Sequence, residues 1–217
     1  MAEVAEKCVT RMAVIADSKA DSTKVKEYYD NWAETYTKDF ASADYKGPRL
    51  GAEKLAQFVK DKKSLILDAG CGVGSVGSEL KKLGYTNLDG VDLSPKSIEA
   101  SKALNIYQRL FIDKLGDNRL DVEDDTYDAL ISIGTFIPGH VNQSAFPEFL
   151  RIVKPGGFII IGMREEFLEM ATEYQNGQLD GEMQRLADEK NWEWLQREPI
   201  KEFFAAKPGL HFVFKVL

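Results

Sequence analysis

The fold is decided by residues 65–74, which read Leu65-Ile66-Leu67-Asp68-Ala69-Gly70-Cys71-Gly72-Val73-Gly74. An apolar run is followed by an acid and then by glycines at every second position, and residues 75–83 carry a helical apolar period. This pattern predicts a strand, a tight loop and a helix. Because glycine has no Cβ, such a loop turns sharply and lets a ligand lie on its backbone beside the unpaired amides of a helix N-terminus. The stretch therefore predicts a nucleotide-binding junction.

Two kinds of nucleotide site fit this junction. Residues 72–77 satisfy the pattern G-x-G-x-x-G, which is typical of nicotinamide-dependent dehydrogenases. Asp68 stands two residues before the first glycine and gives instead the form D-x-G-x-G-x-G. This form resembles motif I of class I S-adenosylmethionine-dependent methyltransferases, in which the acid lies near the methionine amino group of the cofactor. We therefore expect S-adenosylmethionine as cofactor, with S-adenosylhomocysteine as product, ahead of NAD.

A second acid follows at the distance that such a ligand requires. Asp92 ends the next predicted strand, residues 87–92, and lies 20 residues beyond Gly72. A carboxylate there reaches the ribose hydroxyls of a ligand on the glycine loop, through charge-assisted hydrogen bonds of about 1.5 to 3 kcal/mol each. Leu93, the next residue, is placed to cover one face of the adenine.

The remaining pattern predicts an α/β fold. After the strands at 65–69 and 87–92, further strands are expected at residues 106–112, 129–134, 158–162, 192–204 and 211–217, the last two joined through Pro208-Gly209. The R-x-x-K-P-G-G turn that starts at Arg151 resembles the turn before strand five of class I methyltransferases. The resemblance implies a Rossmann-like, mostly parallel seven-stranded sheet with helices on both faces and a terminal antiparallel strand pair.

Length and composition favour one intracellular domain. The 217 residues suit a loosely ordered leader at 1–20 and a single domain at 21–217, with a helical lid at 21–60 and a helical cover near the acceptor pocket at 163–190. The net charge of −7 opposes binding to nucleic acid, and the apolar runs are too short to cross a membrane. Cys8 and Cys71 form neither a disulfide pattern nor a metal site, so a cytoplasmic location without a bound metal is expected.

An aromatic segment precedes the glycine loop. Residues 29–36 read Tyr-Asp-Asn-Trp-Ala-Glu-Thr-Tyr and resemble the Y-D-x-W-A-x-x-Y segment found ahead of motif I in many small-molecule methyltransferases. Two interpretations are open. The aromatic rings pack a helix onto the core, or some of them form a lid over the cofactor and shield its sulfonium, at about 0.5 to 2 kcal/mol for each well-placed ring.

Over residues 28–199 the chain resembles the Williams–Beuren-region group of methyltransferase-like proteins. In the wider class an acid after strand three receives the adenine amino group, and here Asp113 or Asp117 can serve. The cofactor site implied by these comparisons of motifs comprises Tyr29, Tyr36, Asp68, Gly70, Cys71, Gly72, Gly74, Asp92, Leu93, Asp113, Leu115 and Ile133. The acceptor side is assigned to Trp32, Phe136 and Arg164.

His140 is the candidate catalytic residue. A hydroxyl, phenol or ammonium acceptor needs a base, and His140 is the side chain near this sheet edge whose unperturbed pKa suits neutral pH. The alternative is that its imidazole ties down the backbone of its own loop. The Asn-Pro-Pro-Tyr signature of enzymes that methylate nucleic-acid or glutamine nitrogens is absent after strand four, where residues 133–136 read Ile-Gly-Thr-Phe. We therefore expect a small-molecule O or N acceptor, with a non-catalytic cofactor-binding partner module as the alternative; the oligomeric state stays open.

Overall fold

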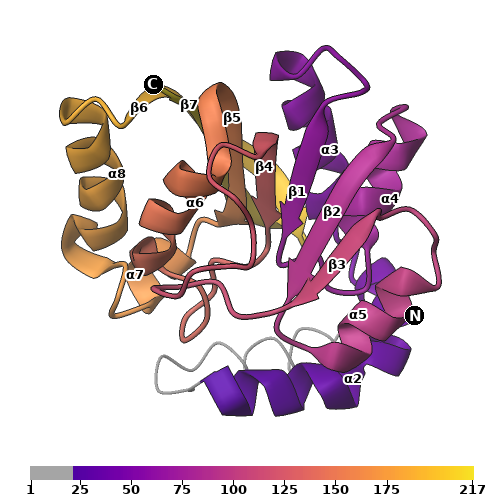
Figure 1. The fold of residues 1–217 in the computed structure, drawn as a ribbon. Coiled ribbons are helices and arrows are strands. Elements are labelled where there is room, and N and C mark those ends of the chain that lie inside the picture. The colour runs from indigo at the N-terminus through magenta and orange to yellow at the C-terminus, as the bar shows by residue number, and fades with distance from the viewer. Residues whose placement is uncertain (1–21) are drawn as a thin grey trace.

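A computed structural model describes residues 22–217, which form one seven-stranded sheet with the strand order β3-β2-β1-β4-β5-β7-β6 (Figure 1). The leader predicted at residues 1–20 lies outside the described residues. The strands are β1 Leu65–Ala69, β2 Asn87–Asp92, β3 Arg109–Ile112, β4 Tyr127–Ile133, β5 Val153–Arg164, β6 Trp192–Phe204 and β7 Lys207–Val216.

The strand directions confirm the predicted fold class. β1 pairs in parallel with β2 and β4, β2 with β3, and β4 with β5. β7 is antiparallel to both β5 and β6, and so forms the terminal antiparallel pair. The chain runs outward from β1 through β2 to β3 and then returns to β4 on the other side of β1. Open α/β sheets bind ligands at such a reversal, outside the carboxyl ends of the strands.

Helices cover both faces of the sheet. In Figure 1, α3, α4 and α5 lie on one side of the strands, and α6, α7 and α8 lie on the other. α2 runs beneath the lower edge of the sheet, beside α5. The helices are α2 Ser22–Ser42, α3 Gly47–Phe58, α4 Ser75–Lys82, α5 Pro95–Lys102, α6 Phe146–Ile152, α7 Phe167–Met170 and α8 Gln178–Asp188, with short 3-10 turns η1 Gln143–Ala145 and η2 Gln175–Gly177.

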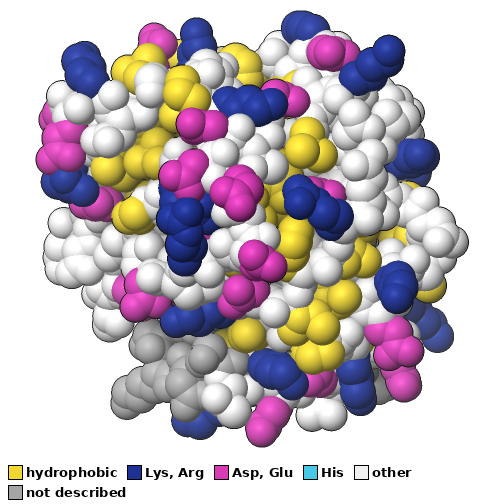
Figure 2. Space-filling model, viewed as in Figure 1, with side chains coloured by type: hydrophobic (Ala, Val, Ile, Leu, Met, Phe, Trp, Pro, Cys, Tyr) yellow, Lys and Arg dark blue, Asp and Glu magenta, His cyan; other side chains and the backbone are white. Residues whose placement is uncertain are grey.

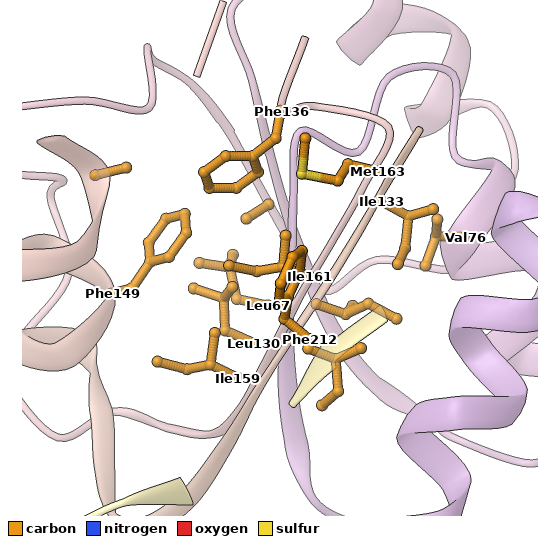
Figure 3. Packing of buried hydrophobic residues seen from close by; sticks show 14 of the residues in the cluster. Leu67, Val76, Leu130, Ile133, Phe136, Phe149, Ile159, Ile161, Met163 and Phe212 are labelled. Atoms are coloured by element: carbon orange, nitrogen blue, oxygen red, sulfur yellow. The ribbon is translucent and has the colours of Figure 1, made fainter. Parts of the chain in front are cut away.

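The core is made by the central strands and the helices on each side of them. Figure 3 shows Phe149 of α6 on one side of the strands and Val76 of α4 on the other, with the side chains of Leu67 and Leu130 between. Phe149, Leu67 and Leu130 are fully buried. Because β1 and β4 are covered on both faces, they read as continuous apolar runs rather than alternating ones. This rigid centre fixes where the strands end, and hence where a ligand can bind.

Several predicted boundaries were wrong. β5 begins at Val153 rather than at residue 158, so the predicted turn at residues 154–157 lies within the strand. The third strand begins at Arg109 rather than at residue 106, because the side chain of Tyr107 turns away to reach Asp68. The last two strands turn at Ala205 and Ala206, whose φ angles are 48° and 59°. Pro208 and Gly209 lie inside β7. A two-residue hairpin turn of type I′ has positive φ at both central positions, and a pair of alanines gives no sequence signal for it.

Residues 163–190 only partly follow the expected helical pattern. β5 continues to Arg164, and α7, η2 and α8 follow it. α8 buries Leu179, Met183 and Leu186 and packs beside β6. The part of this segment nearer to the carboxyl ends of the strands is its beginning, from Arg164 to Tyr174.

Candidate active site

A cavity of about 280 Å³ opens at the carboxyl ends of β1, β2 and β4, close to the lower end of the size range of small-molecule sites. It lies at the chain reversal described above, so the walls come from the loops that follow these strands and from α2. The residues that line it are Val25, Tyr29, Tyr36, Gly70, Gly72, Val73, Asp92, Leu93, Ser97, Asp113, Lys114, Leu115, Gly116, Asp117, Ile133, Gly134, Thr135, Gly139, His140, Val141 and Ser144.

The glycine loop forms the floor of this cavity and is held against β2. The backbone amides of Gly70 and Cys71 both donate to the carbonyl of Val91, at 2.9 and 3.0 Å. Gly70 has a φ of +80°, and a Cβ there would collide with the side chain of Thr135. Gly72 has a φ of +51°, and the space that its Cβ would occupy is open. The loop thus offers bare backbone to a ligand, as its glycine spacing predicts.

Asp92 lies where the strand β2 meets this loop. Its Oδ2 accepts the amide of Gly72 and its Oδ1 accepts the amide of Ser94, each at 2.9 Å. Burial raises the pKa of Asp92, and the two amide donors act against that rise. Each carboxylate oxygen keeps a second lone pair, so Asp92 is oriented by the protein and still able to accept hydroxyl donors. Leu93 lines the cavity next to it.

Asp68 has a different environment, behind the loop. It is 1% exposed, and its Oδ2 accepts from the hydroxyl of Tyr107 at 2.5 Å and from the amide of Gly77 at 3.1 Å. Its Oδ1 is buried and has no hydrogen-bond partner within residues 22–217. Burial raises the pKa of Asp68 to about 7. Sequence reasoning missed Tyr107, because it is 39 residues away and no spacing rule connects the two.

Residues after β3 supply the opposite wall. Asp113 accepts from the amide of Lys114 at 2.8 Å and from the side chain of Asn118 at 3.1 Å. Asp117 is 80% exposed and forms an ion pair with Lys114. Of the two acids that were open for the adenine amino group, Asp113 is the one that the loop orients. Leu115 lies between them and also faces the cavity.

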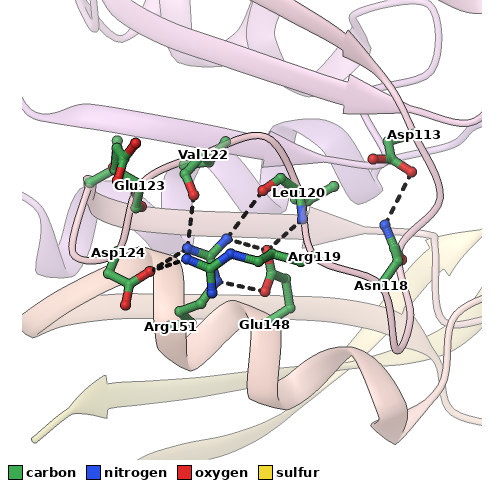
Figure 4. Close-up of polar contacts among 10 residues, drawn as sticks. Asp113, Asn118, Arg119, Leu120, Val122, Glu123, Asp124, Glu148 and Arg151 are labelled. Carbon is green, nitrogen blue, oxygen red and sulfur yellow. Dashed lines mark hydrogen bonds and ion pairs between the residues drawn. The ribbon is translucent and has the colours of Figure 1, made fainter.

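Arg151 of α6 fixes this wall from behind (Figure 4). Its guanidinium donates to the carbonyl of Val122 at 2.8 Å and pairs with Asp124 at 2.6 Å and with Glu148 at 2.5 Å. Glu148 in turn accepts the amide of Leu120 at 2.8 Å. The basic residue that opens the predicted R-x-x-K-P-G-G turn therefore anchors residues 120–124 to α6. This stabilises the loop that carries Asp113.

α2 closes one side of the cavity, and its aromatic residues divide between the cavity lining and the core. Tyr29 and Tyr36 line the cavity. Trp32 is 2% exposed, belongs to the core and donates its indole N–H to Asp39 at 2.7 Å. Asp30 accepts from the hydroxyl of Ser94 at 2.6 Å and so attaches α2 to the start of α5.

Comparison with known proteins places this arrangement in a family. A methyltransferase-domain family model matches residues 66–157. Methyltransferase-like protein 27 of Homo sapiens is 35% identical over 181 residues, covering 82% of this chain and 72% of that protein. The chain belongs to the class I S-adenosylmethionine-dependent methyltransferases. It is an enzyme of the EC 2.1.1 class with S-adenosylmethionine as cofactor, and the dehydrogenase alternative is set aside.

More distant methyltransferases are similar to this chain over part of its sequence or in their fold. Sterol 24-C-methyltransferase of Candida albicans is 27% identical over 147 residues, which cover 61% of this chain and 38% of that protein. The TehB-like S-adenosylmethionine-dependent methyltransferase of Corynebacterium glutamicum has a TM-score of 0.64 at 21% identity, covering 88% of this chain and 99% of that one. At this identity the structural likeness shows the fold alone.

The site of this methyltransferase suits its cofactor on two structural grounds. The open space at Gly72 leaves room for a ligand against the loop backbone. The buried Oδ1 of Asp68 lacks a donor within residues 22–217, which an ammonium group can supply. Gly74 caps α4 with a φ of +88° and does not line the cavity. Cys71 is buried beneath the loop, and burial raises the pKa of its thiol.

His140 lines the methyltransferase cavity, held by its own loop and by the segment after α7. Its Nδ1 lies 3.0 Å from the carbonyl of Pro138, and its Nε2 is buried without a partner within residues 22–217. The amide of Gly139 donates to Glu173 at 2.6 Å, and the hydroxyl of Tyr174 donates to the carbonyl of Ile137 at 3.2 Å. These contacts over 34 and 37 residues were not visible in the sequence.

Burial changes the titration expected for this histidine. It lowers the pKa of His140 to about 4, against the opposing effects of the Pro138 carbonyl and Glu173. The sequence-based expectation of a pKa suited to neutral pH is therefore corrected. With its Nδ1–H donated to Pro138, the neutral imidazole presents the Nε2 lone pair.

The three residues predicted on the acceptor side all lie outside the active-site cavity, called the large cavity below because it adjoins a smaller one. Phe136 is fully buried and stacks on Phe146 with ring centroids 5.9 Å apart, so its ring packs the core. Trp32, described above, is likewise part of the core rather than of the lining. Arg164 lines a separate small cavity that adjoins the large one. No helix within residues 22–217 combines the length and apolar character needed to span a membrane.

Proposed function

We propose that this methyltransferase transfers a methyl group to an oxygen or nitrogen of a small molecule, with His140 as the base. The observation that carries the proposal is the buried, partnerless Nε2 of His140 in the wall of the cavity that the glycine loop floors. A large macromolecular acceptor would have to insert its reacting group past α2. The net charge of −7 also argues against a nucleic-acid acceptor, and Figure 2 shows acidic and basic side chains interspersed over one face.

The cofactor is proposed to lie across the glycine loop. Asp92 would accept the ribose hydroxyls, Leu93 and Leu115 would contact the adenine, and Asp113 would accept the adenine amino group. The carboxylate of Asp68 would accept a hydrogen bond from the methionine ammonium group from behind the loop. Tyr29 and Tyr36 are proposed to cover the site from α2, in keeping with a lid function for residues 21–60. Their hydroxyls belong to a largely apolar wall that excludes water.

The protein's chemical contribution is positioning and proton removal. When bound, the cofactor supplies a methyl group to an acceptor lone pair as the carbon–sulfur bond breaks and its electron pair stays on sulfur. His140 takes the acceptor proton at Nε2, while the bond from Nδ1 to Pro138 holds the ring in the required tautomer. Holding both reactants in line can supply about 7 to 11 kcal/mol of the barrier. No covalent intermediate on the enzyme is needed.

The experiment is methyl transfer from tritium-labelled S-adenosylmethionine into a small-molecule extract, with His140→Asn beside the wild type. Base catalysis of this kind is worth about a hundredfold or more, so turnover of the variant falls by at least that factor while S-adenosylhomocysteine affinity stays within twofold. The matched control is His211→Asn, because His211 is the other histidine of the chain and does not line the cavity. Label in protein rather than in small molecules would contradict the proposed acceptor class.

The pH profile gives an independent check of the same residue. A base must be unprotonated to act, and the pKa of His140 is about 4. Because kcat/KM reports the groups of the free enzyme, we expect kcat/KM for the acceptor to stay level from pH 8 down to about pH 5 and to fall only as the pH approaches 4. A midpoint near 6.5 would show a solvated histidine and contradict the buried geometry.

A further inference from the structure

The small cavity beside the active site has an unusual combination of walls. Its volume is about 20 Å³, and it shares Tyr29, Tyr36 and Gly134 with the large cavity. Gly134 lies in the common wall, and a Cβ at this position would collide with the hydroxyl of Tyr45. The remaining lining is mostly aromatic, and Arg164 is the charged residue in it. An arginine in an aromatic cavity next to the catalytic histidine needs a physical explanation.

The guanidinium of Arg164 lies over two aromatic rings. Its central carbon is 4.8 Å from the ring centroid of Phe167 and 5.2 Å from that of Phe204. The side chain is 12% exposed. Contacts with ring faces leave the in-plane N–H groups of a guanidinium for other partners. Nη2 pairs with Glu166, whereas Nε is buried and has no acceptor within residues 22–217. A buried N–H without an acceptor is costly, by an amount comparable to a lost hydrogen bond.

The carboxylate that pairs with Arg164 is shared with a second cation. Glu166 pairs with Arg164 through Oε1 and with Lys207 through Oε2, the latter at 3.1 Å, so one carboxylate serves two cations. Burial raises the pKa of Tyr29 and of Tyr45 above the ordinary range, so both hydroxyls stay neutral. An anion that pairs with Arg164 would leave Glu166 with Lys207 as its partner. The electrostatic arrangement thus accommodates one further negative group.

We propose that the methyl acceptor carries a carboxylate on an apolar or aromatic body, and that Arg164 binds this carboxylate through Nε while the reacting atom lies in the large cavity beside His140. The inference rests on the proposed small-molecule methyl transfer. The size of the small cavity selects the anion, because about 10 to 15 Å³ of such volume holds one water-sized group. A cavity of about 20 Å³ therefore favours the edge of a planar carboxylate over a bulkier tetrahedral phosphate or sulfonate.

The test measures transfer of the labelled methyl group into a small-molecule extract, and it compares inhibition of this transfer by a carboxylate and by the matching amide. The carboxylate is not the methylated group, so we expect the labelled product to bind an anion-exchange resin at pH 7. Phenylacetate should inhibit the wild type at a concentration at least tenfold below that of phenylacetamide, and Arg164→Gln should abolish this difference. The same variant should lower transfer at subsaturating acceptor at least tenfold, with S-adenosylhomocysteine affinity within twofold of the wild type.

Two further variants separate a specific contact from a general electrostatic effect. Arg164→Lys keeps the charge but loses the planar fork, so its transfer should fall between those of the wild type and of Arg164→Gln. It also replaces Arg164→Gln if that variant fails to bind S-adenosylhomocysteine. Lys201→Gln removes an exposed positive charge from β6 that lines neither cavity, and should transfer within twofold of the wild type.

The outcomes distinguish this inference from the proposed function. A labelled small molecule that the resin does not retain, an Arg164→Gln enzyme equal to the wild type, or an equal loss in Lys201→Gln would overturn the carboxylate inference and leave small-molecule methylation in place. Label found in protein, or in no fraction, would overturn both.

Discussion

At the scale of single residues, the carboxylates of Asp68 and Asp92, at the ends of neighbouring strands, lie in different environments. Asp92 lines the cavity and is oriented by two backbone amides. Asp68 is buried behind the loop, with one oxygen bonded by Tyr107 and Gly77 and the other without a partner within the described chain. The first environment suits recognition of neutral hydroxyls and the second suits a cation. Both assignments can be tested separately.

Replacing Asp92 by alanine should weaken S-adenosylhomocysteine binding at least tenfold. The variant removes the charge-assisted acceptor for the ribose hydroxyls, and such bonds are worth about 1.5 to 3 kcal/mol. Isothermal titration calorimetry measures the change, with Asp188→Asn at the end of α8 as a control outside the cavity. An unchanged dissociation constant in a folded Asp92→Ala protein would contradict the proposed ribose contact of Asp92.

Asp68→Asn should change the pH dependence of stability in the ligand-free protein. The pKa of Asp68 is raised to about 7, above its unfolded value, so its stabilising contribution is present at low pH and is lost as the pH rises towards 7. The wild type should lose up to about 1.4 kcal/mol per pH unit relative to the variant over this range, and the difference should level off above pH 7. Urea unfolding of both proteins at pH 5, 6, 7 and 8 measures it; parallel curves would contradict the burial argument.

At the scale of elements, α2 lies outside the sheet and is attached to it by a few contacts. Trp32 and Val25 bury apolar surface, and Asp30 accepts from Ser94, the residue that also caps α5 by accepting the amide of Ser97. Apolar residues that recur along α2 therefore pack into the core, whereas Tyr29 and Tyr36 line the cavity. Because one helix does both, loss of its attachment should affect ligand binding as well as local stability.

Asp30→Ala should loosen α2 without removing the cap of α5. We expect faster amide hydrogen exchange in residues 22–42 and a loss of S-adenosylhomocysteine affinity of about threefold to tenfold, since Asp30 loses its hydrogen bonds from Ser94 and from the amide of Lys96 as well as its ion pair with Lys26. Lys26→Ala is the matched control, because it removes only the ion pair between Lys26 and Asp30. If both variants exchange and bind alike, the contact between Asp30 and Ser94 does not position α2.

At the scale of the whole molecule, the cofactor should stabilise the fold by mass action. S-adenosylhomocysteine at about 100 times its dissociation constant adds about 2.7 kcal/mol, which raises the melting temperature of a domain of this size by about 5 to 10 °C. NAD at the same concentration should leave it unchanged. Differential scanning fluorimetry with both ligands checks this, and stabilisation by NAD alone would contradict the cofactor.

The sequence was sufficient to predict the glycine loop and most of the strands, because these depend on patterns within short segments. The mostly parallel strand direction was implied by the resemblance to class I methyltransferases. D-x-G-x-G-x-G between an apolar run and a helical period is read locally, and the distance from Gly72 to Asp92 follows from one helix and one strand. The predicted site residues Gly70, Gly72 and Asp92 consequently lie together in the structure.

Only the tertiary structure decided which side chains reach the cavity and how they titrate. Phe136 and Trp32 had the right position in the chain, but packing turned their rings into the core. Tyr107 and Glu173 act across 39 and 34 residues, which no local pattern encodes. The pKa of His140 and the partnerless Nε of Arg164 arise from burial by elements that are distant in sequence. Desolvation depends on all surrounding atoms together, so it exists only once the chain has folded.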